Sequence, residues 1–407
     1  MKKGLRAGII LVLILLMTLP VSCSLISRDG GRETPGPTGP GPSLEPSPEP
    51  SLDPTPEPAK GTTTVKLRAV GDIIMHMSQV YAGEREDGYD FKPFFEDIKP
   101  YLEGADLVIG NLETTISNDE RGYHGYPNFK SPEETLEAAK YAGFNILTTA
   151  NNHSFDAKEF GVVNTIEKLE EYGIKFTGTA RSQEERDRIL IVEENDIRVG
   201  ILAYTYGTNG MEVTIPQEKR GYMVNLIDKD LIEADVKRAR EEGAEVIVVA
   251  MHWGDEEQRQ PNSTQKDLAD FLVSLGVDIV LGCHPHVLQP IEIRRAQLED
   301  GSEKDVFIIY SLGNFVSNQD WQYSDSGVII ELDIIKDYDQ DIIYLDNFGY
   351  TPTWVYKFSK GSGYDYRILP VGSFMDGDLN EQAKKRIKEV WNETTSHLGQ
   401  EDLIIFE

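Results

Sequence analysis

Runs of apolar residues with two different periods follow one another along the chain. Alternating or continuous apolar runs bounded by Gly, Asn or Asp predict strands, and apolar residues spaced by three and four predict amphipathic helices. Strands are expected at 65–70, 106–109, 145–150, 174–177, 189–192, 199–203, 245–250, 277–281, 305–310 and 327–335. Helices are expected at 91–102, 132–141, 159–172, 228–242, 264–275 and 380–397. Because the two kinds of element alternate along most of the chain, we expect an α/β domain.

Turn and capping residues mark several of these boundaries. Gly143 follows one expected helix, and Asn262 or Ser263 precedes another. Such residues satisfy the free backbone groups at helix ends. Asn195 and Asp196 separate two short apolar runs, which predicts a tight hairpin.

The first 23 residues are typical of an export signal. Three of the first six side chains are basic, and an uncharged, mostly apolar run follows at 7–21. This run is short for a membrane span and indicates a signal peptide. It ends at Leu19-Pro20-Val21-Ser22-Cys23, which resembles a bacterial lipobox with Pro20 at an unusual place. We therefore expect a lipoprotein-type signal peptide at 1–23, lipidation of Cys23 and an extracytoplasmic protein, with plain secretion or an uncleaved anchor as alternatives.

The remaining chain divides by composition. Residues 24–61 are expected to form a disordered stalk, because the stretch 32–60 contains ten of the 21 prolines and no aromatic residue. The folded domain is expected at 62–337. Residues 338–407 are expected to form a C-terminal extension that packs on this domain. Their Tyr-rich first part contains no recognisable polar motif.

Charge and cysteine content limit the function. A formal net charge of −29 argues against nucleic acid as a partner, because a phosphate backbone requires a basic surface. An acidic substrate would need a metal or a local basic pocket. The two cysteines are Cys23 and Cys283, so lipidation of the first leaves no intramolecular disulfide. We interpret Cys283 as a small core residue.

Residues suited to metal binding recur at one kind of position. They follow the carboxyl ends of predicted strands, which is the edge of an α/β sheet where ligands bind. They are Asp72, Asn111, Glu113, Asn152, His153, His252, His284 and His286. Separately, each could start a turn, cap a helix or form a core hydrogen bond. Together they predict a site.

The segment His284-Pro285-His286 is the densest of these positions. Because Pro285 favours an extended conformation at His284, we expect both histidines to point to the same side. Two hydrogen-bonded loop histidines are the alternative interpretation. Imidazole and carboxylate ligands together suit Zn, Mn or Fe, and the number of ligands suits two ions that share a carboxylate.

Six motifs, in order along 65–335, resemble the signature motifs of the capsule-synthesis CapA family of the calcineurin-like metallophosphoesterase superfamily. They are Gly71-Asp72, Gly110-Asn111-Leu112-Glu113, Ala150-Asn151-Asn152-His153, His252-Trp253-Gly254-Asp255-Glu256, Gly282-Cys283-His284-Pro285-His286-Val287 and Ser311-Leu312-Gly313-Asn314-Phe315. This resemblance implies a four-layer α/β/β/α sandwich with two mixed β-sheets. It also implies an extracytoplasmic location and, in some members, a role in making or exporting poly-γ-glutamate capsule.

The resemblance also implies a role for each site residue. Asp72 would bind the first of two metal ions, Glu113 would bridge both, and Asn152 and His252 would bind the second. His284 and His286 would complete the two sites, one each. His153, paired with Asn152, would be the general acid. Further candidates are a substrate cation, Lys130, and three possible ligands, His76, Asn111 and Glu256. The first motif of phosphoesterases usually has a histidine two positions after the aspartate, whereas here the next histidine after Asp72 is His76, four positions on.

Three functions follow as hypotheses. The first is a surface-anchored, metal-dependent phosphoesterase that acts on an extracytoplasmic phosphoester. The second is a non-catalytic component that binds an acidic polymer or a capsule-assembly membrane protein through the same pocket. The third, for which no residue gives a positive indication, is metal-dependent hydrolysis of an amide in the cell wall or capsule.

Overall fold

The computed structural model describes residues 61–297, 301, 303–399 and 403–406. The expected signal peptide, its Cys23 and the stalk up to Lys60 lie outside the described residues. All described residues belong to one compact unit. Among the described helices, none is long and apolar enough to span a lipid bilayer.

The first of two large sheets combines parallel and antiparallel strands. Its order is β18 (Gly363–Pro370), β17 (Ile342–Lys360), β16 (Ser326–Asp337), β1 (Thr62–Ile73), β4 (Leu107–Leu112), β7 (Ile146–Thr148) and β8 (Lys175–Thr177). Strands β1, β4, β7 and β8 run parallel, whereas β16, β17 and β18 join by antiparallel pairs. Two short strands attach in parallel: β15 (Asn314–Val316) to β1 and β19 (Ile404–Ile405) to β17.

The second sheet is also mixed. Its order is β13 (Leu288–Gln297), β14 (Glu303–Leu312), β12 (Ile279–Cys283), β11 (Val246–His252), β10 (Ile197–Thr205) and β9 (Leu190–Glu194). Strands β10, β11, β12 and β14 run parallel, and the edge strands β9 and β13 are antiparallel to their neighbours. The mixed α/β class with two mixed sheets is thus confirmed.

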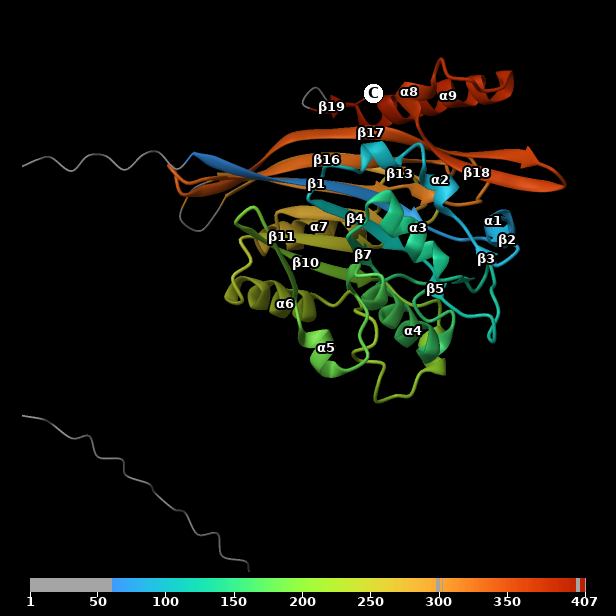
Figure 1. Ribbon diagram of the computed structural model, residues 1–407. Helices are drawn as coiled ribbons and strands as arrows, with labels where there is room; N and C mark the ends of the chain where they lie inside the picture. The colour runs from blue at the N-terminus through green and yellow to red at the C-terminus, as the bar shows by residue number, and fades with distance from the viewer. Residues whose placement is uncertain (1–60, 298–300, 302, 400–402, 407) are drawn as a thin grey trace, which may run out of the picture. The chain divides into compact units, whose positions relative to one another are not determined.

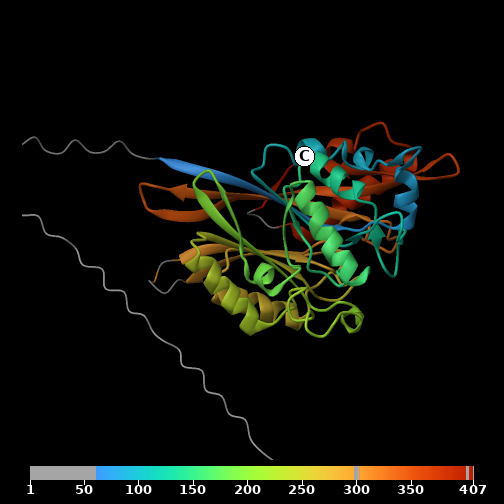
Figure 2. The same ribbon diagram turned by 60° about the horizontal axis from the view of Figure 1, so that its bottom comes forward.

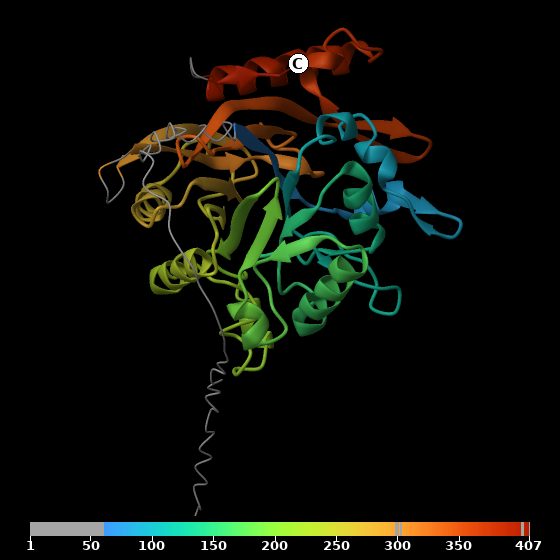
Figure 3. The ribbon, with the colours of Figure 1, turned by 60° about the vertical axis from the view of Figure 1, so that its left-hand side comes forward.

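Helices flank the sheets. The helices are α1 (Met77–Gly83), α2 (Lys92–Phe95), α3 (Glu134–Ala142), α4 (Lys158–Glu171), α5 (Gln183–Asp187), α6 (Lys229–Glu241), α7 (Ser263–Ser274), α8 (Val371–Phe374) and α9 (Glu381–Leu398). Figure 1 shows α9 across β17, and Figures 2 and 3 show α6 and α4 at the opposite side of the unit. Short two-stranded pairs are β2 (Glu84–Arg85) with β3 (Gly88–Tyr89) and β5 (Thr115–Ile116) with β6 (Lys130–Ser131).

Burial explains this packing. Alternate apolar residues of β1, such as Val65 and Leu67, pack with residues of the second sheet, such as Val246 and Val248. This buried cluster joins the two sheets face to face. Separate clusters attach α3 to the first sheet and α6 and α7 to the second. The expected core residue Cys283 lies in the cluster between the sheets, as predicted.

Local signals place several element ends correctly. Gly143 ends α3 with a left-handed φ of 113°, and Asn262 caps α7 by accepting a hydrogen bond from the Gln265 amide. Asn195 and Asp196 adopt φ of 48° and 62° and connect β9 to β10, so the predicted hairpin is confirmed.

The expected helix at 91–102 is wrong as a single element. It is divided into α2 and a 3₁₀ turn at Lys99–Tyr101, with Pro93 and Pro100 in the first turn of each piece. Proline lacks an amide hydrogen and clashes with the preceding turn, so a helix can begin at each proline but cannot continue through Pro100.

The segment after residue 337 is part of the first sheet. Strand β17 pairs with β16 along most of its length and with β18 on its other side. The division expected between residues 337 and 338 therefore falls at a hairpin turn within one sheet. Weak alternation concealed these strands, because β17 has exposed or half-exposed residues at both ends.

Candidate metal centre

The carboxyl ends of parallel strands from both sheets bring the candidate ligands together. Asp72 in β1 is in register with Asn111 in β4, and Glu113 is the first residue after β4. His252 ends β11, and His284 follows β12. Gly71 permits this arrangement, because a Cβ atom there would lie 1.9 Å from the Gly313 carbonyl oxygen.

Asp72, Glu113 and His286 form a first ligand group. His286 Nδ1 lies 3.0 Å from Asp72 Oδ2, and His286 Nε2 lies 3.8 Å from Glu113 Oε1. Each residue offers one ligand atom, and these atoms lie within 4.8 Å of one another. All three residues are buried.

Glu113, His252 and His284 form a second ligand group that shares Glu113 with the first. His252 Nε2 lies 3.4 Å from Glu113 Oε1 and 2.8 Å from Asn152 Oδ1. Asn152, at the end of the first sheet, is thereby placed beside a histidine of the second. The structure thus brings together all six residues that the sequence proposes as metal ligands.

Three buried atoms of the centre lack a hydrogen-bond partner, and this makes the centre suited to bind cations. Both carboxylate oxygens of Glu113 and Nδ1 of His284 are buried and have no hydrogen-bond partner among the described residues. An ionised carboxylate without a partner is very costly in the protein interior, whereas a bound cation offsets that cost. Imidazole and carboxylate ligands suit Zn, Mn or Fe.

The charges in the centre depend strongly on one another. Burial and the nearby Asp72 raise the pKa of Glu113 well above its usual range. Burial also disfavours ionised Asp72, but hydrogen bonds and the charge of His286 lower the pKa of Asp72 below its ordinary value. Burial lowers the pKa of His252 to about 3. At His286 burial acts in the same direction, but Glu113 and Asp72 outweigh it and raise the pKa to about 9.

His153, the candidate general acid, is held by a carboxylate that sequence reasoning missed. Its Nδ1 lies 2.7 Å from Asp156 Oδ2, and both side chains are buried. Burial lowers the pKa of His153, but Asp156 outweighs burial and raises it. Asn151 anchors the same turn by donating to the Leu112 carbonyl at 2.7 Å. Asp156 lies three positions after His153 in the sequence, and this spacing is the signal that could have indicated the pair.

The four further candidates are placed differently. Asn111 Nδ2 lies 2.7 Å from Asp72 Oδ1 and 3.3 Å from His252 Nδ1, so Asn111 connects two ligands. Glu256 is exposed and forms a third possible ligand group with His284 and His286, whose ligand atoms lie within 4.8 Å of one another. His76 precedes α1 and its Nδ1 accepts the Asn318 amide hydrogen at 3.2 Å, outside each ligand group. Lys130 is half-buried, and its charge partly offsets the burial that raises the pKa of Asp156.

The expected extended conformation of His284-Pro285-His286 is wrong. His284 has a φ of 97° and His286 a φ of 58°. Left-handed residues other than glycine cost about 1–3 kcal/mol each. The His284 amide donates to Asp72 Oδ2 at 3.3 Å, and the Pro285 carbonyl accepts from the Glu257 amide at 2.9 Å. These contacts hold a turn in which both imidazoles still face the centre.

Two aromatic residues that the sequence did not indicate border the centre. The ring of Tyr206, which is 49% exposed, lies 4.6 Å from the His284 ring and 6.4 Å from the His252 ring. The Trp321 ring lies 6.4 Å from the His286 ring. Both follow strands as loop residues, where no periodicity distinguishes them.

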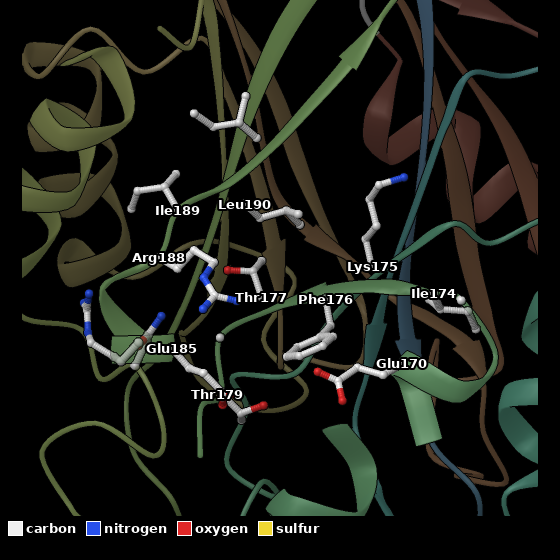
Figure 4. Close-up of a pocket in the computed structure, with 15 residues that line it drawn as sticks. Glu170, Ile174, Lys175, Phe176, Thr177, Thr179, Glu185, Arg188, Ile189 and Leu190 are labelled. Carbon is white, nitrogen blue, oxygen red and sulfur yellow. The ribbon is translucent and has the colours of Figure 1, made fainter. Parts of the chain in front are cut away.

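A separate cavity of about 570 Å³ lies between the edge strands β8 and β9 (Figure 4). Phe176 and Leu190 contribute apolar surface to it, and Glu170 and Arg188 contribute charge. It shares no residue with the metal centre.

Known proteins resemble this chain in sequence and fold. A family model described as bacterial capsule synthesis protein PGA_cap matches residues 66–319. The capsule biosynthesis protein CapA of Bacillus anthracis is 30% identical over 271 residues, which cover 64% of this chain and 62% of that protein. The PGA biosynthesis protein CapA of Bacillus subtilis (strain 168) is 26% identical over 272 residues, which cover 66% of this chain and 67% of that protein.

Among solved structures, the calcineurin-like phosphoesterase YfkN of Bacillus subtilis matches with a TM-score of 0.40 and 15% identity, over 83% of this chain and 100% of that one. The sequence match covers less than two thirds of the Bacillus anthracis relative, at 62% of its length. The family model nevertheless spans most of the described unit. This chain therefore belongs to the bacterial capsule synthesis protein family PGA_cap, as its motifs predicted.

Proposed function

We propose that this protein is a metal-dependent phosphoesterase that acts outside the cytoplasm in the synthesis or export of a capsule or another envelope polymer. One observation carries this proposal: the buried, unpartnered carboxylate of Glu113 is shared by two ligand groups. Two cations that share one carboxylate can contact both oxygens of a phosphoester.

Each residue has a role in this proposal. Asp72, Glu113 and His286 would hold one ion, and Glu113, His252, His284 and Asn152 the other. Such ions polarise a phosphoryl oxygen and lower the pKa of water. His153 donates a proton through Nε2 to the leaving oxygen, because Asp156 engages its Nδ1. Tyr206 and Trp321 border the centre, with their rings 4.6 Å from the His284 ring and 6.4 Å from the His286 ring.

The cellular setting is inferred from the relatives and from the amino terminus. The two Bacillus relatives are described as proteins of capsule and PGA biosynthesis, and a Mycobacterium tuberculosis relative as a probable polyglutamine synthesis accessory protein. Lipidation of Cys23 would attach the domain to the outer face of the membrane. In this proposal capsule-assembly membrane proteins are its partners, and an acidic polymer or a phosphoester is the substrate.

His153→Ala is expected to reduce turnover by at least about a hundredfold while bound metal is retained. General acid catalysis contributes about 10²–10⁴-fold, and His153 belongs to neither ligand group. Metal content is measured by elemental analysis of the purified protein, and hydrolysis of an aryl phosphodiester is assayed on the same sample with added Mn, Zn or Fe.

The matched control is His124→Ala, which changes a histidine outside both groups and should preserve metal and turnover. Metal-loaded protein without any turnover would contradict the enzymatic proposal. It would instead favour a non-catalytic polymer-binding component. The placement of His76 outside the ligand groups supports that second candidate, because the first metal then lacks the histidine usual in phosphoesterases.

A further inference from the structure

Glu256 lies in the loop that connects β11 to α7, beside the metal centre. Its carboxylate forms a ligand group with His284 and His286, in which the three ligand atoms lie within 4.8 Å of one another. His286 belongs to the first ligand group of the centre and His284 to the second. The Glu256 carboxylate is therefore near a histidine of each group, whereas the proposed function gives it no role.

Hydrogen bonds hold the Glu256 loop against the turn that carries the two histidines. The amide of Glu257 donates to the Pro285 carbonyl at 2.9 Å. On the other side, the fully buried side chain of Gln289 donates to the Gln258 carbonyl at 2.8 Å. Because both neighbours of Glu256 are tied to this part of the fold, its backbone is fixed next to the histidines.

The atoms that face Glu256 are suited to share a cation with it. Nδ1 of His284 is buried and has no hydrogen-bond partner among the described residues. A neutral imidazole and an ionised carboxylate both offer lone pairs, so a cation can join them. Because zinc bonds to nitrogen and oxygen are about 2.0–2.2 Å long, two ligand atoms of one ion lie about 3–4 Å apart. Small side-chain movements therefore suffice for ligation by Glu256.

Glu256 differs from the other members of the ligand groups in its exposure. It is exposed, whereas the other members are all buried: Asp72, Glu113, His252, His284 and His286. The side of the centre that is open to solvent is thus the side of Glu256. An exposed carboxylate regains its hydration when it leaves an ion, whereas a buried carboxylate does not. Another anion can therefore replace Glu256 more readily than it can replace Asp72 or Glu113.

We propose that Glu256 is a metal ligand on the open side of the centre, and that an anionic substrate competes with it for the bound ions. In this exchange a phosphoryl oxygen takes the place of a carboxylate oxygen on the metal, and no proton or electron is transferred. Ligation by Glu256 does not depend on catalysis. Its competition with a phosphoester rests on the proposed function.

Isothermal titration of the metal-free, full-length protein with Mn or Zn tests the ligation. Glu256→Gln should weaken the binding of at least one ion by about tenfold or more, since even residues that only orient a ligand contribute about 10–100-fold to metal affinity. The matched control is Glu257→Gln, which removes the same charge from an exposed neighbour outside every ligand group and should preserve the affinity. The difference should persist between about 0.05 M and about 0.5 M salt, because salt screens attraction through solvent but not ligation.

Titration of the metal-saturated protein with inorganic phosphate tests the competition. Phosphate should bind Glu256→Gln at least about threefold more tightly than the parent, because the competing negative charge is removed from the ions. The substitution is thus expected to weaken metal binding and to strengthen phosphate binding. A local distortion of the centre would weaken both.

Equal metal affinity in the parent and in Glu256→Gln overturns the proposal. A loss of affinity that disappears at high salt, or that recurs in Glu257→Gln, overturns it too, and so does phosphate binding that is unchanged or weaker in the metal-saturated Glu256→Gln variant. Aryl phosphodiester turnover by the parent separates these outcomes from the proposed function. Turnover together with full metal affinity in Glu256→Gln leaves the proposed function standing, whereas weakened metal binding in Glu256→Gln without turnover by the parent supports ligation alone.

Discussion

Glu113→Gln is expected to abolish the stabilisation that divalent metal confers on the protein. Both ligand groups share this carboxylate, so its neutralisation weakens each of them. A metal present at 100 times its dissociation constant stabilises a folded protein by about 2.7 kcal/mol, and this gain should disappear. Denaturant unfolding with and without added Mn or Zn measures the gain, and elemental analysis should show loss of bound metal.

For the protein stripped of metal, we expect that Glu113→Gln does not lower the stability. Glu113 is then a buried carboxylate without a partner, next to Asp72, and burial raises its pKa. The Glu113→Gln substitution replaces this costly buried acid with an uncharged amide of similar shape, so the stripped variant should be at least as stable as the stripped parent. Glu233→Gln on the exposed face of α6 serves as the control and should change neither quantity. Full metal content in Glu113→Gln would refute the shared-carboxylate centre.

Asp235→Ala is expected to lower the free energy of unfolding by about 3–5 kcal/mol. Asp235 accepts two hydrogen bonds from Arg186, at 2.9 Å and 2.6 Å, and one from the Tyr204 hydroxyl at 2.8 Å. The Arg186 and Asp235 side chains are only 3% and 2% exposed. Removal of the carboxylate leaves a buried guanidinium without its partner. Urea unfolding followed by circular dichroism measures the loss.

Two further variants separate this effect from a general sensitivity of α6. Glu241→Ala breaks an exposed pair with Lys237 at 3.8 Å and should cost less than about 0.5 kcal/mol. Replacing all three buried partners, Arg186→Met with Asp235→Leu and Tyr204→Phe, should recover most of the stability, because a buried ion pair is worth little more than apolar residues of similar volume and no hydroxyl is then left without its acceptor. A loss below about 1 kcal/mol in Asp235→Ala would contradict the argument.

Local chemistry in the sequence determined most element ends. The left-handed φ of 113° at Gly143 and the Asn262 cap with Gln265 require only residues within one turn. The Asn195-Asp196 turn is likewise local. At Pro100 the spacing of apolar residues gave a wrong prediction. The apolar residues around it predicted one helix, whereas the proline ring permits only two short helical pieces.

The sequence also determined which residues belong to the candidate centre, because each follows a predicted strand. The structure decided how they are grouped. Asp72 and Glu113 come from one sheet and His252 and His286 from the other, and only the packing of the two sheets brings these side chains within 4.8 Å in shared groups. The left-handed turn at His284 and the contact of His153 with Asp156 also depend on neighbours distant in sequence or on the fold of a loop.

The position of strand β17 was decided by tertiary structure alone. A strand with one covered face and exposed ends has little alternation, so its position depends on pairing with β16 and β18 and on cover by α9. Backbone hydrogen bonds between strands are formed by every residue type except proline as a donor, and burial is settled only when distant segments meet. The sequence therefore determined the local elements and the chemical identity of the site, whereas long-range packing determined its geometry.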